Sequence, residues 1–205
     1  MNNELYQLLL SGKIGDGCFI TQTKKSSNKR YYFLTNSINS DYIKHKQDIF
    51  TKNGIFTRKL NCSSGYKKTS KIYGFSTNVI SEVTEIGNMN IEDVLDNLDL
   101  KGLIYYYLDD GTLHKHKHFM HIYCNTFSEH EANKLIELLY KYYPIKKCKL
   151  AYDRKKDGRI FPYIRIPVPT AREFSKDIRK FLIDNNINSL LYKTVSPSQT
   201  IENIE

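Results

Sequence analysis

The stretch GLIYYYLDDG, Gly102–Gly111, decides how this 205-residue chain is organised. An apolar and aromatic run ends there in two aspartates and a glycine. The same order occurs near the N-terminus in LLLSGKIGDG, Leu8–Gly17. Asp16 and Asp110 lie 94 residues apart, so each opens about half of the chain. This spacing predicts two copies of one structural unit.

An aspartate at the end of each apolar run predicts a cation at that place. The last carbonyl oxygens of a helix are unpaired, and the helix C-terminus carries a partial negative charge. A carboxylate there is therefore unfavourable unless a cation binds, and carboxylate and carbonyl oxygens suit magnesium or calcium. Gly17 and Gly111 are predicted to adopt the left-handed conformation that ends many helices. An ordinary Asp-Gly turn is the alternative at each position.

These two segments resemble the motifs of LAGLIDADG homing endonucleases in their two-motif, monomeric form. The resemblance implies an α/β (α+β) fold of two pseudo-symmetric αββαββα halves. Each half is an antiparallel DNA-binding sheet under helices, and the halves are joined at paired motif helices. The implied activity is a double-strand break with short 3′ overhangs in a long, non-palindromic DNA target. The first motif departs from the family pattern, because Lys13 stands where an apolar residue is usual.

The resemblance also assigns residues. It makes Asp16 and Asp110 catalytic metal ligands, with Gly15 and Asp109 beside them at the metal, and it makes Lys193 an accessory catalytic lysine. Asp109 remains a competitor for the role given to Asp110. The cofactor expected is Mg²⁺, as two or three ions, and Ca²⁺ is expected to bind without supporting cleavage. The first half has no basic residue at the place that corresponds to the accessory lysine.

The distribution of charge predicts a polyanionic partner. The net charge is +9. Residues 20–75 contain 12 Lys and Arg against 2 Asp and Glu, and residues 112–170 contain 12 against 5. Residues 82–111 contain 1 against 8. Two basic blocks, each following one motif, favour neutralisation of nucleic-acid phosphates.

Both halves are predicted to contain the same elements in the same order, from residues 1–88 and 89–195, followed by a polar tail, 196–205. The patterns predict helices over 4–16, 40–53, 77–86, 128–143 and 170–183, with Gly54 as the stop of the second helix. Residues 91–110 are predicted to hold the second motif helix, entered through a short helix or turn. Strands are predicted over 18–25, 30–36, 55–61, 69–76, 112–117, 119–126, 146–153 and 159–168. Thr77 is predicted to cap the third helix. Ser128 with Glu131, and Thr170 with Glu173, are predicted capping boxes.

Alternation along the strands predicts one apolar face on each sheet and one polar face that contacts DNA. In residues 160–168, isoleucines share one side while Tyr163 and Arg165 share the other. A two-stranded ribbon fits the major groove, where such side chains reach base edges and phosphates. The DNA-binding candidates are Gln22, Lys24, Lys25, Arg30, Arg58, Lys67, Lys68, Lys71, His114, His116, Lys147, Lys149, Arg154, Arg159, Tyr163 and Arg165. Zinc binding by His114, His116, His118 and His121 is a weaker alternative, because strand spacing keeps such side chains apart.

The remaining composition limits the class of protein. No apolar run reaches the ~18 residues that a membrane helix needs, and no secretion signal pattern is present. The four cysteines, Cys18, Cys62, Cys124 and Cys148, are predicted to be reduced and buried. We expect a monomer in the cytoplasm, nucleoid or an organelle matrix, neither secreted nor membrane-bound, encoded in an intron or free-standing. The alternatives are a maturase that binds its host intron RNA and a non-cleaving DNA-binding regulator.

Overall fold

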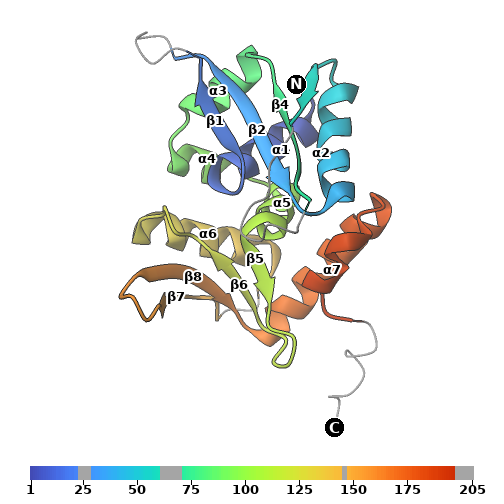
Figure 1. Ribbon diagram of the computed structural model, residues 1–205. Helices are drawn as coiled ribbons and strands as arrows, with labels where there is room; N and C mark the ends of the chain where they lie inside the picture. Colours follow the sequence, from blue (N-terminus) through green and yellow to red (C-terminus); the bar gives the residue numbers. More distant parts are fainter. Residues whose placement is uncertain (23–28, 61–70, 145–146, 197–205) are drawn as a thin grey trace. The chain divides into compact units, whose positions relative to one another are not determined.

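The computed structural model describes residues 1–22, 29–60, 71–144 and 147–196. The chain divides into two compact units, Met1–Tyr106 and Tyr107–Glu205 (Figure 1). The division falls inside one helix, α5 (Leu100–Asp110). The repeat boundary predicted at residues 88 and 89 therefore remains a proposal.

The first unit holds the first αββαββα set. Its elements are α1 (Asn3–Ile14), β1 (Cys18–Thr21), β2 (Tyr31–Ser37), α2 (Ser40–Lys52), β3 (Thr57–Lys59), β4 (Tyr73–Thr77), α3 (Ser81–Asn88) and α4 (Ile91–Asn97), followed by the start of α5. The antiparallel sheet has the strand order β1-β2-β4-β3. Its inner face is aromatic: Phe33 and Phe75 are fully buried and both contact Phe50 of α2.

The second unit repeats this arrangement. After the end of α5 come β5 (Gly111–Leu113), β6 (Met120–Tyr123), α6 (Glu129–Tyr142), β7 (Lys149–Arg154), β8 (Ile160–Ile166), α7 (Val168–Asp184) and the 3-10 helix η1 (Asn188–Lys193). The sheet order β5-β6-β8-β7 matches that of the first unit. Met120, Ile122, Ile164 and Ile166 are fully buried on its inner face. The prediction of two equivalent α+β halves is thus confirmed.

The two sheets also agree in register, residue by residue. In the first sheet, Cys18 pairs with Leu34, and Leu34 pairs with Ser76. The equivalent pairs in the second sheet are Thr112 with His121, and His121 with Arg165. Equivalent positions therefore carry different side chains on the two outer faces. Leu34 corresponds to His121.

Two predicted helix caps are wrong. The Thr77 hydroxyl lies inside β4 and accepts a hydrogen bond from the Phe33 backbone N–H at 3.0 Å, and α3 begins only at Ser81. Thr170 is buried within α7, which starts at Val168 because its Pro169 needs no N–H in the first turn. The capping box of Ser128 and Glu131 is confirmed.

The motif glycines are required for a reason other than the one predicted. Neither Gly17 nor Gly111 has a positive φ. A Cβ on Gly17 would lie 2.5 Å from the Gly12 carbonyl oxygen, and a Cβ on Gly111 would overlap the ring and the carbonyl oxygen of Tyr107. Close packing after each motif helix, rather than backbone torsion, therefore excludes a side chain.

Two composition-based predictions can be compared with the structure. None of the helices in the described ranges is long and apolar enough to cross a membrane. Cys124 and Cys148 are buried free thiols, and burial raises the pKa of each to about 11. Cys18 is exposed, against prediction, because strand alternation places it on the outer face of β1. Cys62 lies outside the described residues.

Candidate functional site

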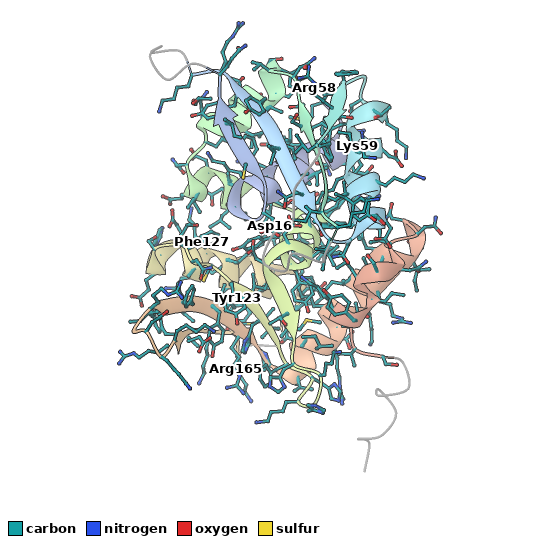
Figure 2. All side chains as sticks on the ribbon, viewed as in Figure 1. Asp16, Arg58, Lys59, Tyr123, Phe127 and Arg165 are labelled. Atoms are coloured by element: carbon teal, nitrogen blue, oxygen red, sulfur yellow. The ribbon has the colours of Figure 1, made fainter. Side chains whose placement is uncertain are left out.

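Asp16 follows directly on the end of the first motif helix. Gly15 leaves the helical conformation at φ −113°, ψ −140°, while its N–H still donates to the Ser11 carbonyl at 2.8 Å. Asp16 therefore lies just beyond the Gly15 C-cap of α1, and its side chain is exposed (Figure 2). The carboxylate projects from the negative end of a helix, as the sequence predicted.

A lysine fixes this helix end to the last helix of its own half. The Lys13 Nζ donates to the Gly87 carbonyl at 2.8 Å, next to the end of α3. Its stem lies beside Phe19, with Nζ 5.5 Å from the ring centroid. Burial lowers the pKa of Lys13. The departure of Lys13 from the motif pattern thus has a structural explanation.

The entry to the second motif helix is fixed by polar contacts within the first unit. Asp99 caps α5, because its Oδ1 accepts from the Gly102 N–H at 3.0 Å. Gln7 of α1 donates to the Asn97 carbonyl at 3.0 Å and accepts from the Asp99 N–H at 2.8 Å. In the next turn, His45 Nε2 lies 2.8 Å from the Tyr105 hydroxyl.

The C-terminal end of α5 carries Asp109 and Asp110, both half-buried. The Lys193 Nζ donates to the Leu108 carbonyl at 2.7 Å and lies 3.5 Å from the Asp109 carbonyl. The Tyr107 hydroxyl donates to the Lys193 carbonyl at 2.8 Å. A cation therefore sits at the helix terminus where the partial charge is negative, and a buried tyrosine holds its backbone.

The residues at both helix ends suit a hard divalent cation. Each helix end brings a carboxylate and unpaired carbonyl oxygens, which are the ligands that magnesium and calcium prefer. No group of three or more His, Cys, Asp or Glu side chains converges within the described parts of the chain. Backbone, solvent or substrate oxygens would therefore have to complete the coordination.

The outer face of the first sheet mixes polar side chains with the apolar residues Ile20, Tyr32 and Leu34. Arg58 pairs with Ser76, so both lie on the face opposite Phe75 (Figure 2). A hollow of about 300 Å³ on this face is lined by Gln22, Tyr32, Arg58, Ser76, Thr77, Asn78 and Val79. Two of the predicted DNA-binding residues, Gln22 and Arg58, are thus brought together.

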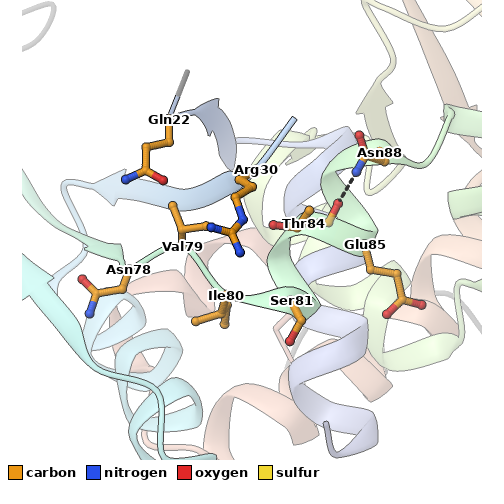
Figure 3. Close-up of a pocket in the computed structure, with 9 residues that line it drawn as sticks. All are labelled: Gln22, Arg30, Asn78, Val79, Ile80, Ser81, Thr84, Glu85 and Asn88. Carbon is orange, nitrogen blue, oxygen red and sulfur yellow. Dashed lines mark hydrogen bonds between the residues drawn. The ribbon is translucent and has the colours of Figure 1, made fainter. Parts of the chain in front are cut away.

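A larger pocket of about 1000 Å³ adjoins this hollow (Figure 3). Gln22, just after β1, and Arg30, just before β2, line it opposite Ser81 and Thr84 of α3. The lining is completed by Asn78, Val79, Ile80, Glu85 and Asn88. Arg30 and Gln22 therefore lie together at the end of the β1–β2 pair that is remote from Asp16.

The outer face of the second sheet carries three of its predicted DNA-binding residues. Arg165 pairs with His121 on one side and Lys149 on the other, and Tyr163 pairs with Tyr123. These side chains share one face by alternation, as predicted. Arg154 lies on the opposite face of β7, because it pairs with Ile160 rather than with a residue of the Arg165 side.

The remaining candidates are scattered. His114 and His116 lie in or beside the exposed turn between β5 and β6, and Lys147 precedes β7. Arg159 forms an ion pair with Asp157 at 2.7 Å in the exposed turn before β8. Lys71 lies over the Tyr73 ring at 5.2 Å. Lys24, Lys25, Lys67 and Lys68 lie outside the described residues.

The histidine-rich segment is not a pair of long strands. Residues 114–118 form a turn in which His118 has φ +53°, so β5 and β6 are shorter than predicted. A turn could have gathered the histidines around zinc. Among the described residues they form no group that could hold a metal ion.

The sequence profile of the LAGLIDADG DNA endonuclease family matches residues 9–174, most of the chain. The chain belongs to this family. The match runs from the second half of α1 through α5 and both sheets, and it confirms the resemblance read from the two Asp-Gly segments. No curated protein sequence matches this chain significantly.

Solved structures of LAGLIDADG proteins share the fold. The homing endonuclease I-WcaI bound to its DNA recognition sequence gives a TM-score of 0.66 at 16% identity, over 95% of this chain and 87% of that one. The homing endonuclease I-DmoI with DNA and Ca gives 0.54 at 13% identity, over 85% and 88%. The N-terminal LAGLIDADG domain of DUF199/WhiA gives 0.53 at 9% identity, over 85% and 80%.

Several residues of this LAGLIDADG site were missed by sequence reasoning. Lys13 and Tyr107 act through partners more than 70 residues away, and no local pattern reports such contacts. Asp99 could have been found, because an aspartate just before an apolar helix is a common N-cap. Phe119 also went unassigned on the outer face of the second sheet, whereas the histidine cluster that contains His121 had been interpreted as DNA-facing.

Proposed function

We propose that this LAGLIDADG protein is a site-specific homing endonuclease that makes a double-strand break in a long DNA target. The observation that supports the proposal best is the repeated unit: each motif helix ends in an aspartate that is followed at once by a sheet with an exposed outer face. The outer face of the first sheet carries the exposed cation Arg58, and that of the second sheet carries the exposed cations Lys149 and Arg165.

Asp16 and Asp110 would hold the divalent cations, with Mg²⁺ as the working ion and Ca²⁺ as one that binds without supporting cleavage. Bound cations would stabilise negative charge that develops on the phosphate during hydrolysis. Asp109 and the Gly15 backbone are further candidate ligands. The Lys193 ammonium now donates to the Leu108 carbonyl. By exchanging this acceptor for a phosphate oxygen, it would stabilise the same charge.

The target would be double-stranded and non-palindromic. Equivalent positions of the two sheets carry Leu34 and His121, or Ser76 and Arg165. These pairs differ in size, charge and hydrogen-bonding capacity, so the two faces cannot read the same base sequence. Since one chain contains both motifs, a monomer would suffice.

The test is selection of cleaved sites from a randomised double-stranded DNA library in Mg²⁺, with a parallel binding selection in Ca²⁺. One long asymmetric site should emerge from both, and only the Mg²⁺ reaction should cut it. The matched controls are Asp16→Asn and Asp110→Asn. Recovery of a bound site that neither cation allows to be cut would exclude the nuclease, and preferential binding of structured RNA would favour the maturase.

A further inference from the structure

The outer face of the second sheet carries a continuous row of aromatic rings. His114 lies 4.5 Å from Phe119 between ring centroids, Phe119 lies 4.9 Å from His121, and His121 lies 4.1 Å from Tyr163. Tyr163 in turn lies 5.9 Å from Tyr123. We refer to these five residues as the aromatic row. They come from the β5–β6 turn, β6 and β8.

Strand pairing places the aromatic row on the side away from the core. Tyr123 pairs with Tyr163, while the neighbouring pair of Ile122 and Ile164 is fully buried. Every ring of the aromatic row remains at least partly exposed. The Arg165 guanidinium covers Phe119, 4.6 Å from the ring centroid, and is itself exposed.

The chemistry of the aromatic row is mainly apolar and uncharged. Phe119 has no polar atom, and His121 Nε2 is buried without a hydrogen-bond partner in the described part of the chain. Burial, helped by Arg165 and His114, lowers the pKa of His121 to about 4, so this ring is neutral at pH 7. The outer face of the first sheet differs in kind, because its apolar residues Ile20 and Leu34 are aliphatic and lie on the same side as Ser76 and Arg58.

We propose that the second sheet recognises thymine C5-methyl groups through the aromatic row, with Arg165 reading one guanine among them. This inference rests on the proposed function and adds the chemistry of one half-site. The methyl group of thymine is the apolar feature that the major groove offers at a base edge. Arginine is the usual reader of guanine O6 and N7, and Phe119 holds Arg165 in place beforehand.

Insertion of unpaired bases between neighbouring rings fits the aromatic row less well. Bases stack about 3.4 Å apart, so a base inserted between two rings needs a gap of roughly 6.8 Å. The ring centroids of the aromatic row lie 4.1–5.9 Å apart. The rings therefore cover one another, and they offer ring edges and outer faces to groups that approach from a duplex.

Deoxyuridine provides the test, because it pairs like thymidine and lacks only the C5-methyl group. Binding sites are selected in Ca²⁺ from two randomised duplex libraries, one made with thymidine and one with deoxyuridine. In the thymidine library, we expect thymine preferences in the half-site of the second sheet. In the deoxyuridine library, those positions should lose their preference. Each methyl in contact should be worth roughly fourfold in affinity.

Variants assign the effect to the aromatic row. Phe119→Ala should bind thymine and uracil forms of the selected site within about twofold of each other. Ile183→Ala, a truncation of an exposed apolar side chain on α7 and outside both sheets, should keep the parental discrimination. Equal affinity of the parent protein for both forms would overturn the inference and leave the proposed function standing.

Two further outcomes are decisive. Tighter binding of a single-stranded oligonucleotide than of the duplex, lost in Phe119→Ala, would also overturn the inference and would indicate base stacking. Failure of both libraries to yield a site would remove the proposed function, and the inference with it.

Discussion

Tyr107→Phe should slow DNA cleavage by disordering Lys193, without changing any residue that touches metal or phosphate. The Tyr107 side chain is fully buried, and its hydroxyl donates to the Lys193 carbonyl at 2.8 Å. The Lys193 Nζ then donates to the Leu108 carbonyl at 2.7 Å. The two bonds close a loop between the end of α5 and η1. Removing the hydroxyl breaks the bond to the Lys193 carbonyl and leaves only the bond from Nζ to Leu108.

The expected magnitude follows from these contacts. A hydrogen bond of this kind contributes about 1 kcal/mol to the free energy of unfolding, which lowers the Tm of a chain of this size by about 2–4 °C. Lys193→Met removes a charge-stabilising donor and should slow cleavage by about 100-fold or more. Tyr107→Phe leaves the ammonium group present but less well placed, so a loss of about tenfold is expected.

The assay compares conversion of supercoiled plasmid to nicked and linear forms in Mg²⁺, with DNA affinity measured in Ca²⁺. Tyr143→Phe is the matched control, because Tyr143 is a buried tyrosine that donates to Asp177, away from α5. It should lose similar stability and cut at the parental rate. Tyr107→Phe should have no further effect in the Lys193→Met background. Parental cleavage by Tyr107→Phe, or an undiminished tenfold loss in that background, would refute the coupling.

Four other outcomes are expected. Asp16→Asn and Asp110→Asn should each abolish double-strand cleavage of plasmid and keep DNA affinity within about tenfold. If Asp109→Asn is inactive and Asp110→Asn is active, Asp109 is the second metal ligand in place of Asp110. DNA affinity should fall with salt at a log–log slope of about −0.9 per neutralised phosphate, and a flat response in filter binding would contradict phosphate contact. Burial lowers the pKa of His45 to about 4 from an unfolded value near 6.5. The contribution of His45 to stability is therefore complete above about pH 6.5 and is lost as pH falls towards 4. The fall in Tm between pH 7 and 5 should accordingly be smaller in His45→Gln than in the parent protein. Gly111→Ala should lower the free energy of unfolding by at least about 2 kcal/mol, checked by urea titration, because its Cβ would overlap Tyr107.

Local signals predicted the architecture well. The capping box at Ser128, the stop at Gly54 with φ +72° and the alternation around Arg165 each depend on residues close in sequence. Two such units at one spacing were enough to indicate a repeated fold. Elements were misplaced where tertiary contacts decide: Thr77 resembles a helix cap but satisfies the Phe33 N–H across the sheet.

The candidate site was predictable only in part. The sequence located the aspartates because each ends an apolar helix before a glycine. It could not show that Lys13 reaches Gly87, or that Lys193 returns to Leu108, since those pairs are set by the fold. Alternation along a strand predicts only which face each side chain is on, and it could not show that Phe119, His121 and Tyr163 form one connected surface.

The different constraints on the Asp-Gly junctions have an evolutionary consequence. Asp16 is exposed, so under the proposed function its replacement would abolish cleavage and leave a folded protein. Gly17 is packed against Gly12 and Phe33, so its replacement would remove the protein itself. Related proteins that no longer cleave DNA but still fold should therefore have lost the aspartate at the position of Asp16 and kept the glycine at that of Gly17. Under the proposed function, a gene that has lost the aspartate would still encode a folded protein with both DNA-binding faces, available for another role.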